Sequence, residues 1–220
     1  MLLYLLRRIF LFIPTLIVIS LITFFISVNA PGDPVEIMLN RLEGSESHQA
    51  QKQAVEKDYA EIRHKLGFDL PIFYFSLTDA TVSDTLYKIP KKEHRETLKR
   101  LSNEYGNWAA VSDYYLAERK LESDLFSLEK DSFNYSQLSE SKILISDLFL
   151  QYEEKKINAT IEKLAFVPVS SIHDLKISFL KLSFEKNPYK KYIPSIHWYG
   201  FNNQYHRWLM NFIAGDFGVS

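Results

Sequence analysis

The chain has no cysteine and only seven glycines among its 220 residues. The absence of cysteine excludes a disulfide framework, a thiolate metal site and a cysteine nucleophile. The small number of glycines argues against a β-sandwich, which needs many turns. An excess of charge of one sign is also absent, since 26 basic and 27 acidic side chains leave a net charge of -1. A chain with so little net charge is not expected to bind nucleic acid.

Sequence motifs for catalysis and cofactor binding are absent too. No glycine-rich run leads into a lysine, so no phosphate-binding loop is expected. The six histidines show no spacing that is typical of a zinc site. These residues are His48, His64, His94, His173, His197 and His206. Neighbouring carboxylates such as Glu153 and Glu154 do not face each other on a helix, which makes them poor candidates for acid-base catalysis. We therefore expect a protein that is not an enzyme, with no catalytic residue, no cofactor and no metal ligand.

One long apolar run is present near the N-terminus. Residues 9–28 contain no charged side chain, and as a helix at ~1.5 Å per residue they would span ~30 Å, the thickness of the hydrocarbon core of a bilayer. The polar groups of this run are the hydroxyls of Thr15, Ser20, Thr23 and Ser27. Such hydroxyls can bond back to carbonyls of their own helix. We expect residues 1–34 to form a transmembrane anchor in the lipid bilayer, with a bend at Pro14.

Two other interpretations of this run stay open. A signal peptide could be cleaved after Val28-Asn29-Ala30, although the apolar region of such a peptide, at roughly 7 to 15 residues, is shorter than this run. A buried hairpin helix is the second, but a helix without charge on any side would need a far larger protein to cover it.

The charges on the two sides of the run predict its orientation. Arg7 and Arg8 precede it, whereas residues 29–48 contain one arginine and four acidic side chains. Positive charge marks the cytoplasmic side of a membrane helix. We therefore expect the chain in the inner (plasma) membrane, with a cytoplasmic N-terminus and with residues 35–220 extracytoplasmic.

Residues 35–75 are expected to form an extracytoplasmic segment that contains one exposed helix. Apolar residues recur at helical spacing within residues 47–66, and Gly67 suits the left-handed conformation that ends many helices. The apolar stripe consists of Val55, Tyr59, Ile62 and Leu66. Residues 66–77 contain Pro71 and several aromatic side chains, which indicates an extended and partly buried connection.

Residues 76–195 are rich in Lys, Glu, Ser and Leu and are expected to form a separate helical domain. Their apolar residues recur at helical spacing in successive stripes. The stripes are Leu98-Leu101-Tyr105-Trp108, Ala117-Leu121-Leu125-Leu128, Leu144-Leu148-Tyr152 and Ile157-Ile161-Leu164. The helical phase changes at residues 153–156, which predicts a bend or a boundary. The fold class is therefore predicted as mainly α, with one N-terminal transmembrane helix followed by an extracytoplasmic all-α helical domain.

Two further helices are predicted towards the C-terminus. Ser171 and Asp174 fit the Ser-x-x-Asp pattern of a capping box, and Asn187-Pro188 would end the helix that follows. The apolar face of that helix is Leu175, Phe179 and Leu182. Residues 196–220 are expected to contain an amphipathic helix that ends near Gly215. Its apolar face is Tyr205, Leu209 and Phe212, widened by Trp208 and Ile213. That face suits either the lipid headgroup region or a docking site on the helical domain.

Three separated segments together resemble a known family. The first is the apolar span with Arg7-Arg8-Ile9 and Pro14-Thr15, followed by Ala30-Pro31-Gly32-Asp33-Pro34. The second is Leu66-Gly67-Phe68-Asp69-Leu70-Pro71. The third joins Tyr205-His206-Arg207-Trp208-Leu209 with Gly215-Asp216-Phe217-Gly218-Val219-Ser220. In this order they resemble the inner-membrane permease subunits of ABC importers, the binding-protein-dependent transport systems for dipeptides, oligopeptides and nickel.

The resemblance implies a permease subunit that performs no chemistry itself. Its partners would be a second permease subunit, an ATP-binding subunit and an extracytoplasmic substrate-binding protein. In the family the second and third segments lie close together, so residues 76–195 would be a large extracytoplasmic insertion. The third segment leads into a further membrane helix in the family, which makes this chain the expected N-terminal part of such a permease, with residues 196–220 leading towards that helix.

Two functions of other classes stay open. The chain could be a single-pass, membrane-anchored extracytoplasmic helical domain for interaction or sensing. It could also be a secreted binding protein after removal of a signal peptide. The sequence does not identify a substrate for any of these functions.

Overall fold

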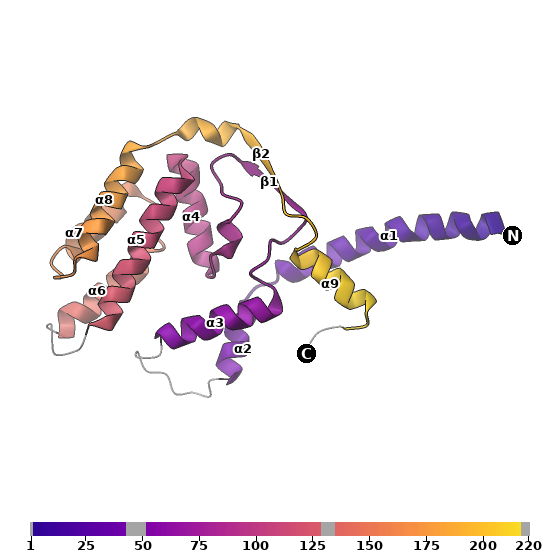
Figure 1. The fold of residues 1–220 in the computed structure, drawn as a ribbon, viewed down its shortest axis with the longest axis horizontal. Coiled ribbons are helices and arrows are strands. Elements are labelled where there is room, and N and C mark those ends of the chain that lie inside the picture. Colours follow the sequence, from indigo (N-terminus) through magenta and orange to yellow (C-terminus); the bar gives the residue numbers. More distant parts are fainter. Residues whose placement is uncertain (1, 43–51, 129–134, 217–220) are drawn as a thin grey trace. The chain divides into compact units, whose positions relative to one another are not determined.

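The computed structural model describes residues 2–42, 52–128 and 135–216. These residues are mainly helical, as predicted. They belong to two compact units. Unit 1 comprises Met1–Tyr74 and Tyr199–Ser220, and unit 2 is the continuous stretch Phe75–Trp198. Figure 1 shows the chain leaving unit 1 through strand β1 and returning to it through strand β2, so unit 2 is inserted into the sequence of unit 1.

Helix α1 (Leu2–Val28) is the apolar helix of unit 1 and contains Pro14. Within it, Phe10–Val28 is long and apolar enough to cross a membrane, a criterion of length and composition that a signal sequence also meets. The side chains of this stretch are almost entirely exposed, so it is not a core helix of the described residues. Thr15 and Ser20 donate hydrogen bonds to carbonyls of their own helix at 2.9 and 2.8 Å, as predicted.

Helices α2 (Pro34–Leu42) and α3 (Lys52–Leu66) pack together in unit 1. Their small core consists of Val35, Leu39 and Tyr59, with Ile62 and Phe68 against it. Helix α2 was not predicted, and α3 matches the C-terminal part of the predicted helix. Residues 47–51 and the side chain of Val55 lie outside the described part of the chain.

Helix α9 (Gln204–Ile213) is the C-terminal helix of unit 1. The side chain of Asn203 caps it by accepting a hydrogen bond from the amide of His206 at 2.8 Å. Beyond its last turn Gly215 has a φ of 78°, in agreement with the predicted helix end. Residues 217–220, the last part of the third family-like segment, lie outside the described residues.

Unit 2 is a helical domain arranged around α5. Its helices are α4 (Lys92–Tyr105), α5 (Trp108–Ser127), α6 (Tyr135–Leu148), α7 (Glu154–Leu164) and α8 (Ser171–Phe184), with 3-10 turns η2 (Leu86–Lys88) and η3 (Pro188–Tyr192). Helix α5 packs against α8, α6 and α4. The largest fully buried side chains of this core are Leu101, Tyr105, Tyr114, Leu121, Leu125, Ile145, Leu148, Ile157, Leu164, Leu175 and Leu182. Most of these residues come from the predicted stripes, because helical spacing brings them to one face of each helix.

Two predictions about helix ends in unit 2 are wrong. The first stripe is not continuous, since Gly106 ends α4 with a φ of 68° and Trp108 belongs to the next helix. The capping box at Ser171 and Asp174 does not form. The hydroxyl of Ser171 is buried without a hydrogen-bond partner, and the carboxylate of Asp174 instead accepts a hydrogen bond from Lys120 at 2.7 Å.

The two ends of unit 2 pair as an antiparallel ribbon, which the prediction of an all-helical domain did not include. Strands β1 (Phe75–Asp79) and β2 (Pro194–Trp198) run side by side, with Phe75 opposite Trp198 and Leu77 opposite Ile196. Each strand is only five residues long. A strand this short carries little periodic signal, and its partner lies more than a hundred residues away in the sequence.

Candidate functional site at the end of the apolar helix

The site lies in unit 1, where the chain leaves α1 and where α3 and α9 meet. Asp33 opens it. Its side chain accepts a hydrogen bond from the amide of Val35 at 2.9 Å, and Pro34 occupies the first position of α2. A proline there has no amide that would need a partner, and the aspartate satisfies one of the free amides of the helix start.

Asp33 also ties α2 to α3. Its second carboxylate oxygen accepts a hydrogen bond from the hydroxyl of Tyr59 at 2.5 Å. Burial and the hydrogen bond to Asp33 raise the pKa of Tyr59 to about 12. The phenol therefore stays neutral at physiological pH and remains a donor to the carboxylate.

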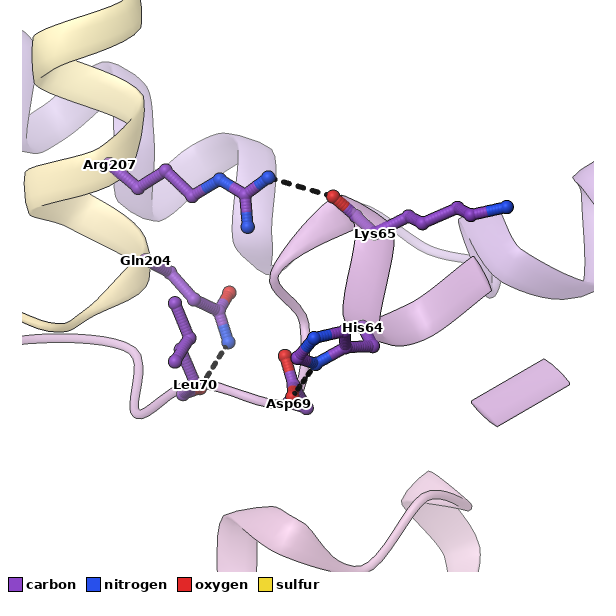
Figure 2. Close-up of polar contacts among 6 residues, drawn as sticks. All are labelled: His64, Lys65, Asp69, Leu70, Gln204 and Arg207. Atoms are coloured by element: carbon purple, nitrogen blue, oxygen red, sulfur yellow. Dashed lines mark hydrogen bonds and ion pairs between the residues drawn. The ribbon is translucent and has the colours of Figure 1, made fainter. Parts of the chain in front are cut away.

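The C-terminal end of α3 is closed by Gly67 and by a side chain from α9. Gly67 has a φ of 75°, and the amide of Phe68 reaches back to the carbonyl of Arg63 at 2.9 Å. Arg207 donates a hydrogen bond to the carbonyl of Lys65 at 2.8 Å (Figure 2). A positive charge at this position also suits the negative end of the helix dipole.

The start of α9 holds the segment that follows Gly67. Gln204 donates from its side chain to the carbonyl of Leu70 at 2.7 Å (Figure 2). The backbone amides of Gln204 and Tyr205 donate to the carbonyls of Pro71 and Ile72 at 2.9 and 3.1 Å. These bonds use the amides that a helix start leaves free, so no water or further side chain is needed to satisfy them.

A hydrogen bond between two side chains closes the same turn from the other side. A ring nitrogen of His64 lies 2.6 Å from a carboxylate oxygen of Asp69 (Figure 2). His64 precedes Gly67 and Asp69 follows it within the same turn, so the left-handed conformation of Gly67 brings the two side chains together.

Tyr205 joins α9 to α1. Its side chain is buried, and its hydroxyl lies 2.8 Å from the hydroxyl of Ser20. The hydroxyl of Ser20 also donates to the carbonyl of Ile17. The ring of Phe24 lies 5.2 Å from that of Tyr205 and 5.8 Å from that of Trp208.

Aromatic side chains of the intervening segment complete the cluster. Phe73 lies between Phe25 of α1 and Tyr205, with ring centroids 6.0 and 5.3 Å apart. The hydroxyl of Tyr74 lies 3.1 Å from a ring nitrogen of His206, and burial raises the pKa of Tyr74. Aromatic contacts with hydroxyls directed to polar partners are typical of the boundary between lipid and water.

The polar contacts of this arrangement hold its elements together. Its polar groups bond to backbone carbonyls, to helix starts or to one another. Among the described residues no group of three His, Asp or Glu side chains could hold a metal ion. We refer to the residues from α1, Asp33, α3, the 67–74 segment and α9 that make these contacts as the junction.

The junction brings together side chains from all three segments that were singled out in the sequence. Tyr205 and Trp208 lie at its centre, Gly67 and Asp69 form its turn, and Asp33 caps its first short helix. Leu209 is half-buried, whereas Phe212 and Ile213 at the end of α9 are exposed.

The roles of Asp33, Gln204 and Arg207 were not predicted from the sequence. The role of Asp33 could have been found, since an aspartate followed by proline is a common helix start. The partners of Gln204 and Arg207 are backbone carbonyls, which leave no pattern in a sequence.

Comparisons of the chain with protein-family models, with curated proteins and with solved structures found no match.

Proposed function

We propose that the chain is the N-terminal part of the membrane-embedded permease subunit of an ABC importer for peptides or nickel. Helix α1 anchors it in the inner membrane, with a cytoplasmic N-terminus and with residues 35–220 on the extracytoplasmic side. The chain performs no chemistry. It acts with a second permease subunit, an ATP-binding subunit and an extracytoplasmic substrate-binding protein.

The observation that supports this proposal is the junction. The family-like segments are separated by unit 2, yet Arg207 contacts the carbonyl of Lys65, and Tyr205 contacts Ser20 of the apolar helix. These contacts join the start of α9 to the end of α3 and to α1. Their contacts give each segment a role in fixing where the chain leaves the apolar helix.

Purification from native membranes tests the proposal. We expect the full tagged chain, extracted in a mild detergent, to carry an ATP-binding subunit and a second permease subunit that mass spectrometry identifies. The junction variant Arg207→Ala should recover several-fold less of both, because it frees the end of α3 from α9. Lys156→Ala, which removes only an exposed pair with Glu153, should recover as much as the unchanged chain.

Two other outcomes would contradict the proposal. A membrane-bound chain that carries neither subunit would support an anchored interaction or sensor domain. A mature protein whose N-terminus lies near Pro31 would show that α1 is a cleaved signal peptide.

A further inference from the structure

The β1–β2 ribbon presents its apolar side chains outwards. Phe75 and Leu77 on β1 are 47% and 70% exposed, and Ile196 and Trp198 on β2 are 71% and 69% exposed. The pairing places Phe75 opposite Trp198 and Leu77 opposite Ile196, so all four side chains share one face. We call these four residues the apolar ribbon face.

The opposite face of the same ribbon is polar and less exposed. Ser76, Thr78, Ser195 and His197 alternate with the apolar residues and are only partly exposed. Ser195 and His197 also lie within 3.1 Å of each other. An antiparallel sheet in water normally turns its apolar face inwards and its polar face outwards. In the ribbon the apolar face is the more exposed one. This arrangement is favourable only if an apolar environment covers that face.

The place of the ribbon in the sequence, directly after residues that contact α1, indicates which apolar environment this is. Phe73 contacts Phe25, which lies in the last turn of the apolar span of α1. Phe75 is two residues further along, so covalent geometry alone keeps its Cα within about 7 Å of that of Phe73. If α1 crosses a bilayer, the ribbon begins at the level of the headgroups.

The residues next to the ribbon have the same chemistry as a membrane-surface segment. Tyr192 and Ile193 precede β2 and are exposed, and Lys190 and Lys191 stand just before them. Aromatic and aliphatic side chains flanked by lysines suit a surface that carries anionic headgroups. The one carboxylate within the two strands, that of Asp79, accepts a hydrogen bond from the amide of Thr81 at 2.9 Å.

We infer that the apolar ribbon face lies in the headgroup region of the bilayer that α1 spans, and that Lys190 and Lys191 bind anionic lipid headgroups beside it. This inference rests on the proposed membrane position of α1. The ribbon thereby fixes the two chain connections of unit 2 at the membrane surface.

Spin labelling of the full chain tests the inference, and the absence of cysteine makes single labels possible. Leu77→Cys and Ile196→Cys place a nitroxide on the apolar ribbon face. Leu116→Cys on α5 is the matched control, since Leu116 is also an exposed leucine of unit 2. The protein is reconstituted in phosphatidylcholine vesicles with or without phosphatidylglycerol. Collisions with oxygen, which enters lipid, are compared with collisions with a water-soluble nickel chelate.

We expect the oxygen-to-chelate ratio at Leu77 and Ile196 to exceed that at Leu116 by about twofold or more. The difference should be larger in vesicles with phosphatidylglycerol, and the double variant Lys190→Gln/Lys191→Gln should reduce it there. Equal ratios at all three positions would overturn the inference by placing the face in water. An immobilised label shielded from both reagents would overturn it too, because protein would then cover the face. A ratio that is the same in both vesicles would overturn the role of the lysines.

A label at Ile19→Cys, within the apolar span, separates this inference from the proposed function. If that label lies outside lipid, the membrane position of α1 is wrong. If it lies in lipid while the labels at Leu77 and Ile196 lie in water, only the inference about the ribbon is wrong.

Discussion

Burial decides the charge of Glu118, on α5 in unit 2. Its side chain is 2% exposed, and its Oε1 is buried without a hydrogen-bond partner. Burial raises the pKa of Glu118 to about 8; the nearby hydroxyl of Tyr114 opposes the increase, and the carboxylate of Glu122 adds to it. The folded protein therefore keeps this carboxyl protonated at neutral pH, whereas the unfolded chain ionises it at a pKa near 4.5.

This difference predicts how stability depends on pH. The folded state binds one more proton than the unfolded state between pH 4.5 and about 8. The contribution of Glu118 to the free energy of unfolding is therefore full below this range and is lost as the pH rises through it. The free energy of unfolding should fall by up to about 1.4 kcal/mol per pH unit. Glu118→Gln should flatten this slope, because glutamine keeps the shape and does not ionise.

Urea denaturation of residues 75–198 at several pH values, followed by circular dichroism, measures the slope. Glu140→Gln on α6 is the control, since Glu140 is exposed and its replacement should leave the slope unchanged. An equally steep slope in Glu118→Gln would mean that another group carries the pH dependence.

Gly106 has both a special conformation and a close neighbour. Its φ is 68°, and a Cβ built there would lie 1.7 Å from the carbonyl oxygen of Asn187. That part of the chain is held by the bond from the amide of Asn187 to the carbonyl of Tyr105 at 2.7 Å. The backbone cannot move aside without breaking this bond, so only glycine fits.

Gly106→Ala should therefore lower the free energy of unfolding of residues 75–198 by more than the ~1–2 kcal/mol of a left-handed alanine alone. Gly106→Asn separates the two causes, because asparagine tolerates a left-handed φ but still carries a Cβ. We expect both variants to be clearly destabilised in urea denaturation. An asparagine variant as stable as the original would contradict the close approach to Asn187 as a cause.

At the scale of elements, most of the helices could be predicted from the sequence, although α2 was not, and the strand pairing could not. Leu121 and Leu125 of one predicted stripe are buried, since helical spacing places them on one face whatever they pack against. The boundary near residues 153–156 is confirmed by the start of α7 at Glu154. The β1–β2 ribbon was missed because its alternation gives no indication of a distant partner.

The junction was predicted only as a set of motifs. The resemblance singled out Gly67 and Tyr205, but their neighbours in space depend on how α9 meets α3 and α1. Gly106 is an example in unit 2 of a role that the sequence did not predict. Its role as a helix end was hidden by a stripe that continues to Trp108 by coincidence of spacing.

The orientation of α1 across the membrane is a prediction about a single element. It follows from Arg7 and Arg8 before the apolar span and from the acidic residues after it. Two single-cysteine variants test it, with Tyr4→Cys before the span and Ser146→Cys on α6. Both positions are exposed. In intact cells or spheroplasts a membrane-impermeant maleimide should label Ser146→Cys and should label Tyr4→Cys only after permeabilisation. The reverse pattern would place residues 35–220 in the cytoplasm.

At the scale of the whole molecule, the sequence of unit 1 is interrupted by unit 2 at one place. Tyr74 and Tyr199 are the residues of unit 1 on either side of the interruption, and the amide of Tyr199 donates to the carbonyl of Tyr74 at 2.7 Å. Two ends that are already hydrogen-bonded can be joined by a short turn. The residues of the junction all lie in unit 1, so none of them is lost if unit 2 is removed.

This arrangement predicts that each unit folds without the other. Residues 75–198 alone should give a mainly helical circular dichroism spectrum and a cooperative melt, since their core consists of their own helices. A chain in which Gly-Asn-Gly replaces residues 75–198 should keep the junction. Of the three tryptophans, this shortened chain retains only Trp208, whose ring packs against Phe24 and Tyr205.

The fluorescence of Trp208 in detergent reports on the junction directly. A packed indole should emit at shorter wavelength than an exposed one, and denaturant should shift the emission to longer wavelength in one transition. Tyr205→Ala in the shortened chain removes the ring between Trp208 and Phe73 and should shift the emission without denaturant, whereas Tyr4→Ala, far from the junction in sequence, should not. If the shortened chain emits like free tryptophan, unit 1 needs unit 2 to fold. If residues 75–198 alone are random coil, the converse dependence holds, and the insertion would be an integral part of one folding unit.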